Sequence, residues 1–156
     1  MAAKDTGINT AMESMGCAKW EIIEDVLPYL DTYLLDIKHM NAEKHRAYTG
    51  KSNVLMLENA KKIAASGMTE LIIRVPVVPG FNDTVQEITD IAKFAESLKG
   101  VEQIHLLPYH RLGQDKYGQL GREYTLTEIR PPEPEHMRLL QDAVQKTTRL
   151  YCQIGG

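Results

Sequence analysis

The run of residues 71–78 (LIIRVPVV) constrains the fold most, because it is rich in β-branched residues and almost continuously apolar. A strand that is covered on both faces has this composition, and such strands are typical of parallel sheets. A helical pattern follows, in which Ile88, Ile91 and Ala95 belong to one apolar stripe. The order of strand then helix recurs four times along the chain. This alternation predicts an α/β fold with a parallel sheet and right-handed crossovers.

The predicted strands are spaced as in a barrel. Four strand–helix units are half of an eight-stranded barrel, or the larger part of a smaller, open one. We therefore expect a parallel-stranded partial (β/α) barrel of about four units plus a C-terminal helix, forming a single domain over residues 1–156. The expected strands are residues 7–14, 33–37, 71–78 and 103–109, with 150–154 as a candidate last strand.

Composition excludes several classes of function. With 43% hydrophobic and 25% charged residues, the chain has the composition of a globular domain and not of a disordered one. The formal charge of −3, with basic residues scattered among acids, leaves no basic stripe for nucleic acid. No apolar run reaches the roughly 18 residues of a membrane span, and the first residues lack the pattern of a signal peptide. We expect a cytoplasmic protein that binds neither nucleic acid nor membrane.

The predicted strand at residues 33–37 ends with an acid and a base, Asp36 and Lys38, two residues apart. Side chains alternate along a strand, so these opposite charges point to the same side of the sheet. A fully buried strand has no structural need for such a pair. In parallel α/β sheets, ligands bind at the carboxyl ends of the strands, so the pair marks a candidate binding site.

Polar residues lie at or near the carboxyl ends of the other predicted strands as well. They are Glu13 and Ser14, Arg74, and His110. Guanidinium and ammonium groups bind carboxylates, and acids accept hydrogen bonds from hydroxyl or amino groups. This set of both signs predicts a site for a zwitterionic or anionic metabolite.

Other chemistries fit these residues less well. Lys38 would form a Schiff base in a barrel aldolase or lyase, although a neighbouring carboxylate favours the charged ammonium. The six-residue spacing of His39 and His45 does not suit two metal ligands on one helix face. His105, inside an apolar strand, fits a hydrogen-bonded core histidine.

Five ordered motifs carry a resemblance to a known family. They are residues 10–16 (TAMESMG), 35–40 (LDIKHM), 48–53 (YTGKSN), 73–83 (IRVPVVPGFND) and 106–113 (LLPYHRLG). In order and spacing they resemble the glycyl-radical-enzyme activating enzymes of the radical S-adenosylmethionine superfamily, of which pyruvate formate-lyase activase is the best-known member. The resemblance implies a partial barrel of the radical S-adenosylmethionine type and runs from near Thr6 to the C-terminus.

The resemblance also implies a reaction. A four-iron four-sulfur cluster would reduce bound S-adenosylmethionine, and the deoxyadenosyl radical would remove a hydrogen from a backbone glycine of a partner enzyme. Asp36 and Lys38 would contact the ribose and methionyl parts of the cofactor, and Arg74 and His110 would complete that site. The family can hold a monovalent cation beside the cofactor, at positions that match Glu13, Ser14 and Asp36.

Two further segments acquire roles from the resemblance. The backbone from Val78 to Asn82 would support the adenine, and Lys116–Tyr124 would face the partner protein. Residues 13–16 (ESMG) look more like the branch that serves glycerol, choline and related dehydratases or lyases than like pyruvate formate-lyase activase itself. The expected partner is therefore a glycyl radical enzyme of the formate-lyase, glycerol or diol dehydratase, or choline-lyase type.

The chain departs from the family at the iron–sulfur site. The C-x-x-x-C-x-x-C motif and the Gly-Gly-Glu motif of the family are absent, and Cys17 and Cys152, which read as reduced structural thiols, cannot replace the cluster ligands. We therefore expect the C-terminal portion of an activase, without the N-terminal cluster-binding strands, without a catalytic residue of its own, and inactive alone.

Two alternatives remain open, namely a short non-catalytic protein that binds a metabolite or a partner, and a barrel lyase that uses Lys38. The missing strands have a further consequence, because the strand at residues 8–12 would lack a neighbour. Unpaired strand edges tend to pair with another chain, so we expect a homodimer or aggregation through this edge.

Overall fold

The structure, a computed structural model, describes residues 2–111, 114–121 and 128–156. Within them, five strands form one sheet in the order β1-β2-β3-β4-β5, and each neighbouring pair is parallel. At least one helix lies between consecutive strands in the chain. The predicted parallel α/β fold is therefore confirmed. The strands are β1 (Ala11–Ser14), β2 (Thr32–Asp36), β3 (Glu70–Val77), β4 (Gln103–Pro108) and β5 (Tyr151–Ile154).

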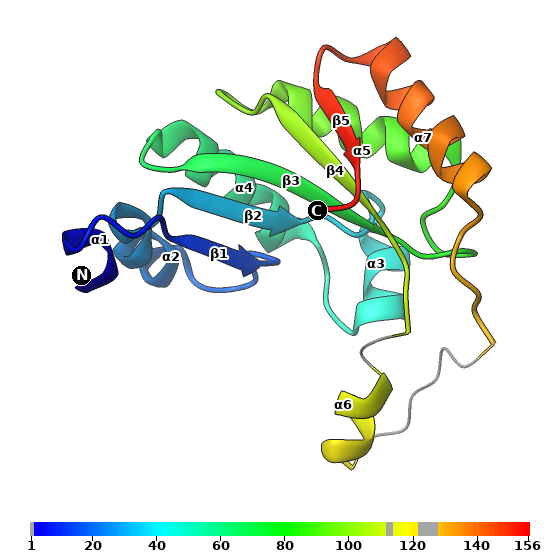
Figure 1. Cartoon of the computed structure of the whole chain (residues 1–156), viewed down its shortest axis with the longest axis horizontal. Helices are drawn as coiled ribbons and strands as arrows, with labels where there is room; N and C mark the ends of the chain where they lie inside the picture. Colours follow the sequence, from blue (N-terminus) through cyan, green and yellow to red (C-terminus); the bar gives the residue numbers. More distant parts are fainter. Residues whose placement is uncertain (1, 112–113, 122–127) are drawn as a thin grey trace.

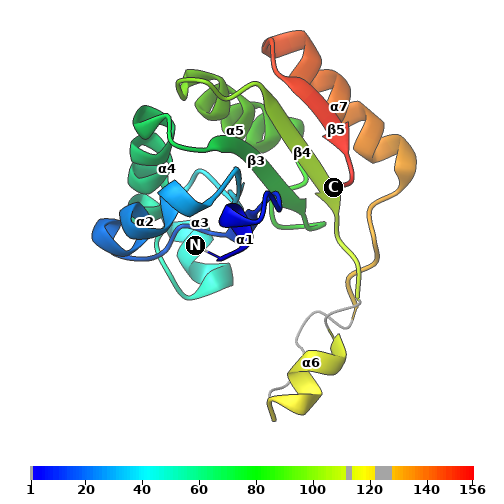
Figure 2. The same ribbon diagram turned by 60° about the vertical axis from the view of Figure 1, so that its left-hand side comes forward.

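The helices α4, α5 and α7 lie along one face of the sheet, and α6 lies apart from it (Figures 1 and 2). A 3₁₀ turn, η1 (Leu27–Tyr29), follows α2 directly. No helix among the described residues is both long and apolar enough to cross a membrane. The α-helices are α1 (Ala2–Asp5), α2 (Trp20–Val26), α3 (Ala42–Thr49), α4 (Val54–Ser66), α5 (Val85–Ser97), α6 (Gln114–Gln119) and α7 (Pro134–Thr147).

Residues 41–50 are mostly polar and carry no apolar stripe, yet the structure makes most of them into α3. Asn41 caps this helix, because its Oδ1 atom accepts hydrogen bonds from the backbone N–H groups of Glu43 and Lys44. Gly50 ends it with a left-handed φ of 76°, a conformation that glycine adopts without a steric cost. The cap residues were visible in the sequence, but the apolar stripe that normally reveals a helix was not.

The core lies between the sheet and the helices. Tyr33, Leu35, Ile73 and Val75 of β2 and β3 are almost completely buried, and they belong to the same apolar cluster as residues of α4, α5 and α7. Burying one side chain of this size stabilises the fold by about 1.5–3 kcal/mol. The helix residues of this cluster include Ile63, Ile88, Ile91, Leu140 and Val144.

The opposite face of the sheet carries the polar residues. The register aligns Asp36 with Arg74, and Arg74 with His105, so these three side chains point to the same side. All three are only partly buried, unlike their neighbours in the core. We call this side the open face, because the core helices pack on the other one. β1 and β5 are the edges of the sheet, which therefore does not close into a barrel.

Candidate functional site

Four charged side chains meet on the open face. One comes from β1, one from β2, one from the turn after β2 and one from β3. The guanidinium of Arg74 makes a two-pronged contact with Glu13, with Nη1 2.7 Å from Oε1 and Nη2 3.2 Å from Oε2. Its third nitrogen, Nε, donates to Oδ1 of Asp36 over 3.1 Å. The other carboxylate oxygen of Asp36 accepts from Nζ of Lys38 over 3.4 Å. We call Glu13, Asp36, Lys38 and Arg74 the acid–base cluster.

The acid–base cluster is electrically neutral as a set, and its members differ in exposure. The side chain of Arg74 is 13% exposed and that of Glu13 is 65% exposed. Burial lowers the pKa of Arg74, but its hydrogen bond with Glu13 and the nearby charge of Asp36 outweigh this effect, so the net pKa is raised. The guanidinium is therefore a fixed positive charge at the centre of the cluster, with an exposed acid on one side.

The structure separates two neighbours that the sequence reading had grouped. Glu13 pairs in register with Leu34, whereas Ser14 pairs with Leu35, whose side chain lies in the core. Ser14 therefore points away from Glu13 and Asp36, and its Oγ accepts a hydrogen bond from Gly16 N–H over 3.1 Å. Among the described residues, no group of three or more histidine, cysteine, aspartate or glutamate side chains is arranged to hold a metal ion.

His110 lies two residues beyond the end of β4 and is exposed. The hydrogen bonds that define the acid–base cluster join residues of β1, β2, β3 and the turn after β2, and none of these bonds involves His110. The segment Lys116–Tyr124, which we expected to face a partner, is described only as far as residue 121. Residues 122–124 lie outside the described residues.

Val78 and Asn82 form a tight turn after β3, and the side chain of Asn82 is completely buried. Its Oδ1 accepts a hydrogen bond from the backbone N–H of Val78 over 2.7 Å. Its Nδ2 donates to the carbonyl of Lys38 over 2.7 Å and to that of Pro76 over 2.8 Å. The side chain of Asn82 thus holds the backbone that carries Lys38, and this side chain is not itself accessible to a ligand.

A polar row on the open face escaped the sequence reading. Glu70 accepts from Gln103 Nε2 over 3.1 Å and from Thr32 Oγ1 over 3.3 Å, and His105 Nε2 lies 3.4 Å from Gln103 Oε1. His105 is therefore not a core residue. Burial, and after it the charge of Arg74, lowers the pKa of His105, which favours its neutral form. The signal was the alternation of polar 103 and 105 with apolar 104 and 106.

The two cysteines cannot hold an iron–sulfur cluster. Cys17 follows β1 and is exposed, whereas Cys152 is buried in β5, at the opposite edge of the sheet. Burial raises the pKa of the Cys152 thiol to about 11, which keeps it protonated and unsuited to metal binding. The two cysteines of this chain therefore do not fit an iron–sulfur cluster. The charges of the acid–base cluster, in contrast, fit a zwitterionic cofactor.

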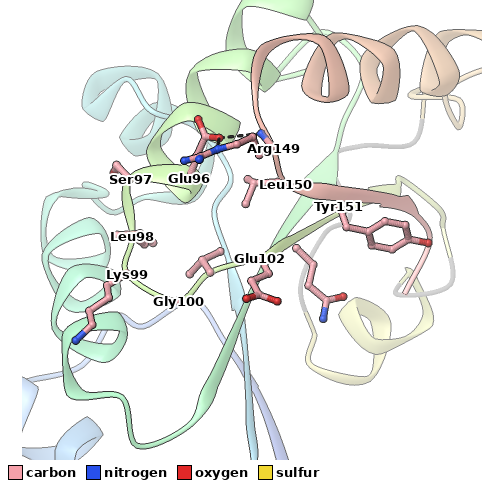
Figure 3. Close-up of a pocket in the computed structure, with 11 residues that line it drawn as sticks. Glu96, Ser97, Leu98, Lys99, Gly100, Glu102, Arg149, Leu150 and Tyr151 are labelled. Carbon is pink, nitrogen blue, oxygen red and sulfur yellow. Dashed lines mark hydrogen bonds and ion pairs between the residues drawn. The ribbon is translucent and has the colours of Figure 1, made fainter.

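A hollow of about 890 Å³ lies at the amino ends of β4 and β5, at the opposite end of the sheet from the acid–base cluster (Figure 3). Glu96 and Arg149 face each other across its rim, where Glu96 Oε1 accepts from the backbone N–H of Arg149 over 2.8 Å. This bond, followed by contacts with the Arg149 side chain, lowers the pKa of Glu96. In parallel sheets ligands bind at the carboxyl ends, so we place the candidate site at the acid–base cluster.

Comparison with known proteins gives the following relationships. The chain is 41% identical over 152 residues to a 4-hydroxyphenylacetate decarboxylase activating enzyme of Clostridioides difficile (strain CD196). A crystal structure of a domain of a pyruvate-formate lyase-activating enzyme from Bacteroides vulgatus ATCC 8482 matches 99% of this chain and 86% of that domain, with a TM-score of 0.80 and 25% identity. No family model matches the chain.

A more distant match supports the fold alone. Streptococcus suis SuiB, solved in complex with S-adenosylmethionine, superposes on 99% of this chain with a TM-score of 0.74 but only 13% identity. Coverage of the relatives is partial. The match to the Clostridioides difficile enzyme includes 97% of this chain but 48% of that enzyme, so the chain spans about half the length of the curated relatives it matches.

Proposed function

We propose that this chain, a homologue of the glycyl-radical-enzyme activating enzymes, forms the S-adenosylmethionine-binding, C-terminal portion of such an enzyme. The observation that carries the proposal is the convergence of Glu13, Asp36, Lys38 and Arg74 on the open face, at the carboxyl ends of neighbouring strands. That position is where parallel α/β sheets bind ligands.

The chemistry of the acid–base cluster suits the amino-acid part of S-adenosylmethionine. The cofactor's carboxylate would pair with Lys38 and Arg74, and its ammonium with Asp36 or Glu13. Each new contact would replace a contact inside the neutral cluster, so binding needs no unpaired charge to be buried. Lys38 and Asp36 would also contact the ribose, the backbone from Val78 to Asn82 would support the adenine, and His110 would complete the site.

The rest of the reaction would depend on a cluster held outside this chain. When bound, a four-iron four-sulfur cluster would supply the electron that cleaves S-adenosylmethionine to a deoxyadenosyl radical. The residues described here would bind and orient the cofactor and would do no redox chemistry themselves. A monovalent cation beside the cofactor would be held by Glu13 and Asp36 through their side chains and by Ser14 only through its backbone carbonyl, since the Ser14 side chain points away.

The partner of the complete enzyme would be a glycyl radical enzyme. The relative with 41% identity is named for a 4-hydroxyphenylacetate decarboxylase, and the formate-lyase, dehydratase and choline-lyase types suggested by residues 13–16 remain proposals beside it. Tyr117 and Leu120 of the segment Lys116–Tyr124 are 43% and 68% exposed, as a surface that faces a partner protein would be.

Self-association of the 156-residue chain is a separate proposal. β1 is an edge of the sheet, and Ile8, just before it, is 60% exposed. An edge strand presents unpaired backbone groups that a second copy of the chain would satisfy by continuing the sheet. We propose that this edge forms a homodimer when no other segment covers it.

The test is titration calorimetry with S-adenosylmethionine and with 5′-methylthioadenosine, which lacks the amino-acid part. We expect the wild-type chain to bind S-adenosylmethionine more tightly than 5′-methylthioadenosine. Arg74→Ala should weaken the binding of S-adenosylmethionine at least tenfold, because a charge-assisted bidentate contact is lost. Arg149→Ala is the matched control, since Arg149 pairs with Glu96 at the other end of the sheet. Equal affinity of both ligands, or equal loss in both variants, would contradict the proposal.

A further inference from the structure

The turn after β2, from Lys38 to Asn41, is held by buried side chains that come from three other segments. Asn53, before α4, donates its Nδ2 protons to the carbonyls of His39 over 2.7 Å and of Met40 over 2.8 Å. Asn82, after β3, donates to the carbonyl of Lys38. Glu87, in the first turn of α5, accepts from the backbone N–H of Met40. These side chains therefore satisfy three carbonyls and one N–H of the turn, where no regular ladder continues.

His39 and Glu87 form a close pair inside this arrangement. The imidazole of His39 is 2% exposed, and its Nδ1 lies 2.6 Å from Oε1 of Glu87, whose side chain is 13% exposed. The same Nδ1 accepts a hydrogen bond from the backbone N–H of Asn41 over 3.0 Å. A contact of 2.6 Å between these two atoms needs a proton between them, and because Nδ1 has one lone pair, this proton and the N–H of Asn41 share it.

The pKa shifts of His39 and Glu87 agree with one proton shared between them. Burial lowers the pKa of His39, and Lys44 and His45 add to the effect. Burial raises the pKa of Glu87 against the opposing effect of its hydrogen bond from Met40. Both shifts favour the uncharged forms, in which the carboxyl O–H of Glu87 donates to Nδ1 of His39.

We propose that Glu87 and His39 are positioning residues, which fix the turn after β2 through one shared proton and so set the place of Lys38 in the acid–base cluster. The effect on the turn is independent of ligand. Its importance for binding rests on the proposed function, because it assumes that Lys38 contacts S-adenosylmethionine. Without the shared proton, either Met40 or Asn41 loses its acceptor, and the backbone next to Lys38 gains a second arrangement.

Amide hydrogen exchange of the full chain, read by NMR at Met40 and Asn41, tests the proposal directly. In Glu87→Ala the Met40 amide loses its acceptor, so we expect it to exchange roughly 10- to 100-fold faster, the factor expected when a buried N–H is left unpaired. We expect a smaller increase at Asn41, whose acceptor His39 loses its own partner. Amides within β2 should keep their wild-type rates. Gln86→Ala is the control, because Gln86 is an exposed neighbour on the same helix and bonds only to Asp90 among the contacts described.

Glu87→Gln separates positioning from simple packing. The amide is nearly isosteric with the carboxyl group, but one atom cannot both accept from Met40 and donate a proton to His39. We therefore expect it to restore protection at one of the two amides and not at both. Restoration of both, unchanged exchange in Glu87→Ala, or faster exchange spread over β2 would overturn the proposal.

Calorimetry with S-adenosylmethionine adds the functional readout. We expect Glu87→Ala to weaken binding at least fivefold while Gln86→Ala leaves it unchanged. Faster exchange with unchanged affinity would overturn the link between the turn and the ligand. If the wild-type chain does not bind S-adenosylmethionine, the proposed function fails, and the exchange rates of Met40 and Asn41 still decide whether Glu87 positions the turn.

Discussion

Replacing Asn82 by alanine is expected to destabilise the fold more than any change to the exposed charges. The Asn82 side chain is completely buried and makes three hydrogen bonds with backbone groups, at 2.7, 2.7 and 2.8 Å. Alanine removes all three and leaves the N–H of Val78 and the carbonyls of Lys38 and Pro76 without this partner.

The magnitude follows from these three bonds. Each contributes about 1 kcal/mol net, and a buried backbone group left unpaired adds a penalty of its own, so we expect a loss of about 3–5 kcal/mol. That is a large fraction of the roughly 5–15 kcal/mol by which a domain is stable. Asn82→Asp should cost at least as much, because a carboxylate turns oxygen lone pairs toward two carbonyls and buries a charge.

Urea unfolding followed by circular dichroism measures this free energy. The midpoint should fall with an unchanged slope, since the surface exposed on unfolding stays the same. Asn9→Ala, at an exposed asparagine, is the matched control and should stay within about 0.5 kcal/mol of wild type. A loss below about 1 kcal/mol for Asn82→Ala, or a well-tolerated Asn82→Asp, would refute the hydrogen-bond reasoning.

Three further outcomes are expected. A maleimide should label one cysteine, Cys17, in the native chain and both after unfolding, as counted by mass spectrometry; rapid native labelling of Cys152 would contradict its burial. Because the pKa of His105 is lowered in the folded state, its contribution is fully present above the unfolded pKa of about 6.5 and is lost as pH falls below it. The urea midpoint should therefore fall less between pH 7.5 and pH 5.5 in His105→Gln than in wild type. An equal fall in both proteins would disprove the pKa shift. Light scattering should give a dimer for the wild-type chain and a smaller species for Ile8→Lys, whereas a wild-type monomer in dilute solution would exclude pairing through β1.

Much of the fold could be predicted because its signals are local. The apolar run at 71–78 becomes β3. Asp36 and Lys38, which alternation predicted on one side of the sheet, do meet there with Arg74. The parallel pairing followed from the alternation of strands and helices, because each helix carries the chain back to the same end of the sheet. The strand at residues 151–154, only a candidate in the sequence, is β5.

The parts that could not be predicted depend on contacts between distant residues. His39 and Glu87 are 48 positions apart in the sequence, and neither lies in a pattern that reveals the other. The motif assigned the backbone of Asn82 to the cofactor, and it did not reveal that the buried side chain bonds to the carbonyls of Lys38 and Pro76. The opposite orientations of Glu13 and Ser14, in contrast, follow from the period of two in a strand, which the motif comparison had not applied.

Three buried asparagines show how such a site is kept in place without regular structure. Nδ2 of Asn59 donates to the carbonyls of Gly16 and Ala18 after β1, Nδ2 of Asn53 to two carbonyls after β2, and Nδ2 of Asn82 to one carbonyl after β2 and one at the end of β3. One amide group has two N–H donors, so each asparagine satisfies two carbonyls at or just beyond the carboxyl ends of the strands.

This arrangement has a consequence for ligand binding. The acid–base cluster is internally paired, so a ligand must exchange contacts with charges that already have partners, and any backbone movement would add to that cost. Fixing the turns with buried amides removes the movement before the ligand arrives. If the proposed function holds, rigid turns beneath exchangeable ion pairs would therefore let a neutral cluster discriminate between a zwitterionic ligand and one that lacks the amino-acid part.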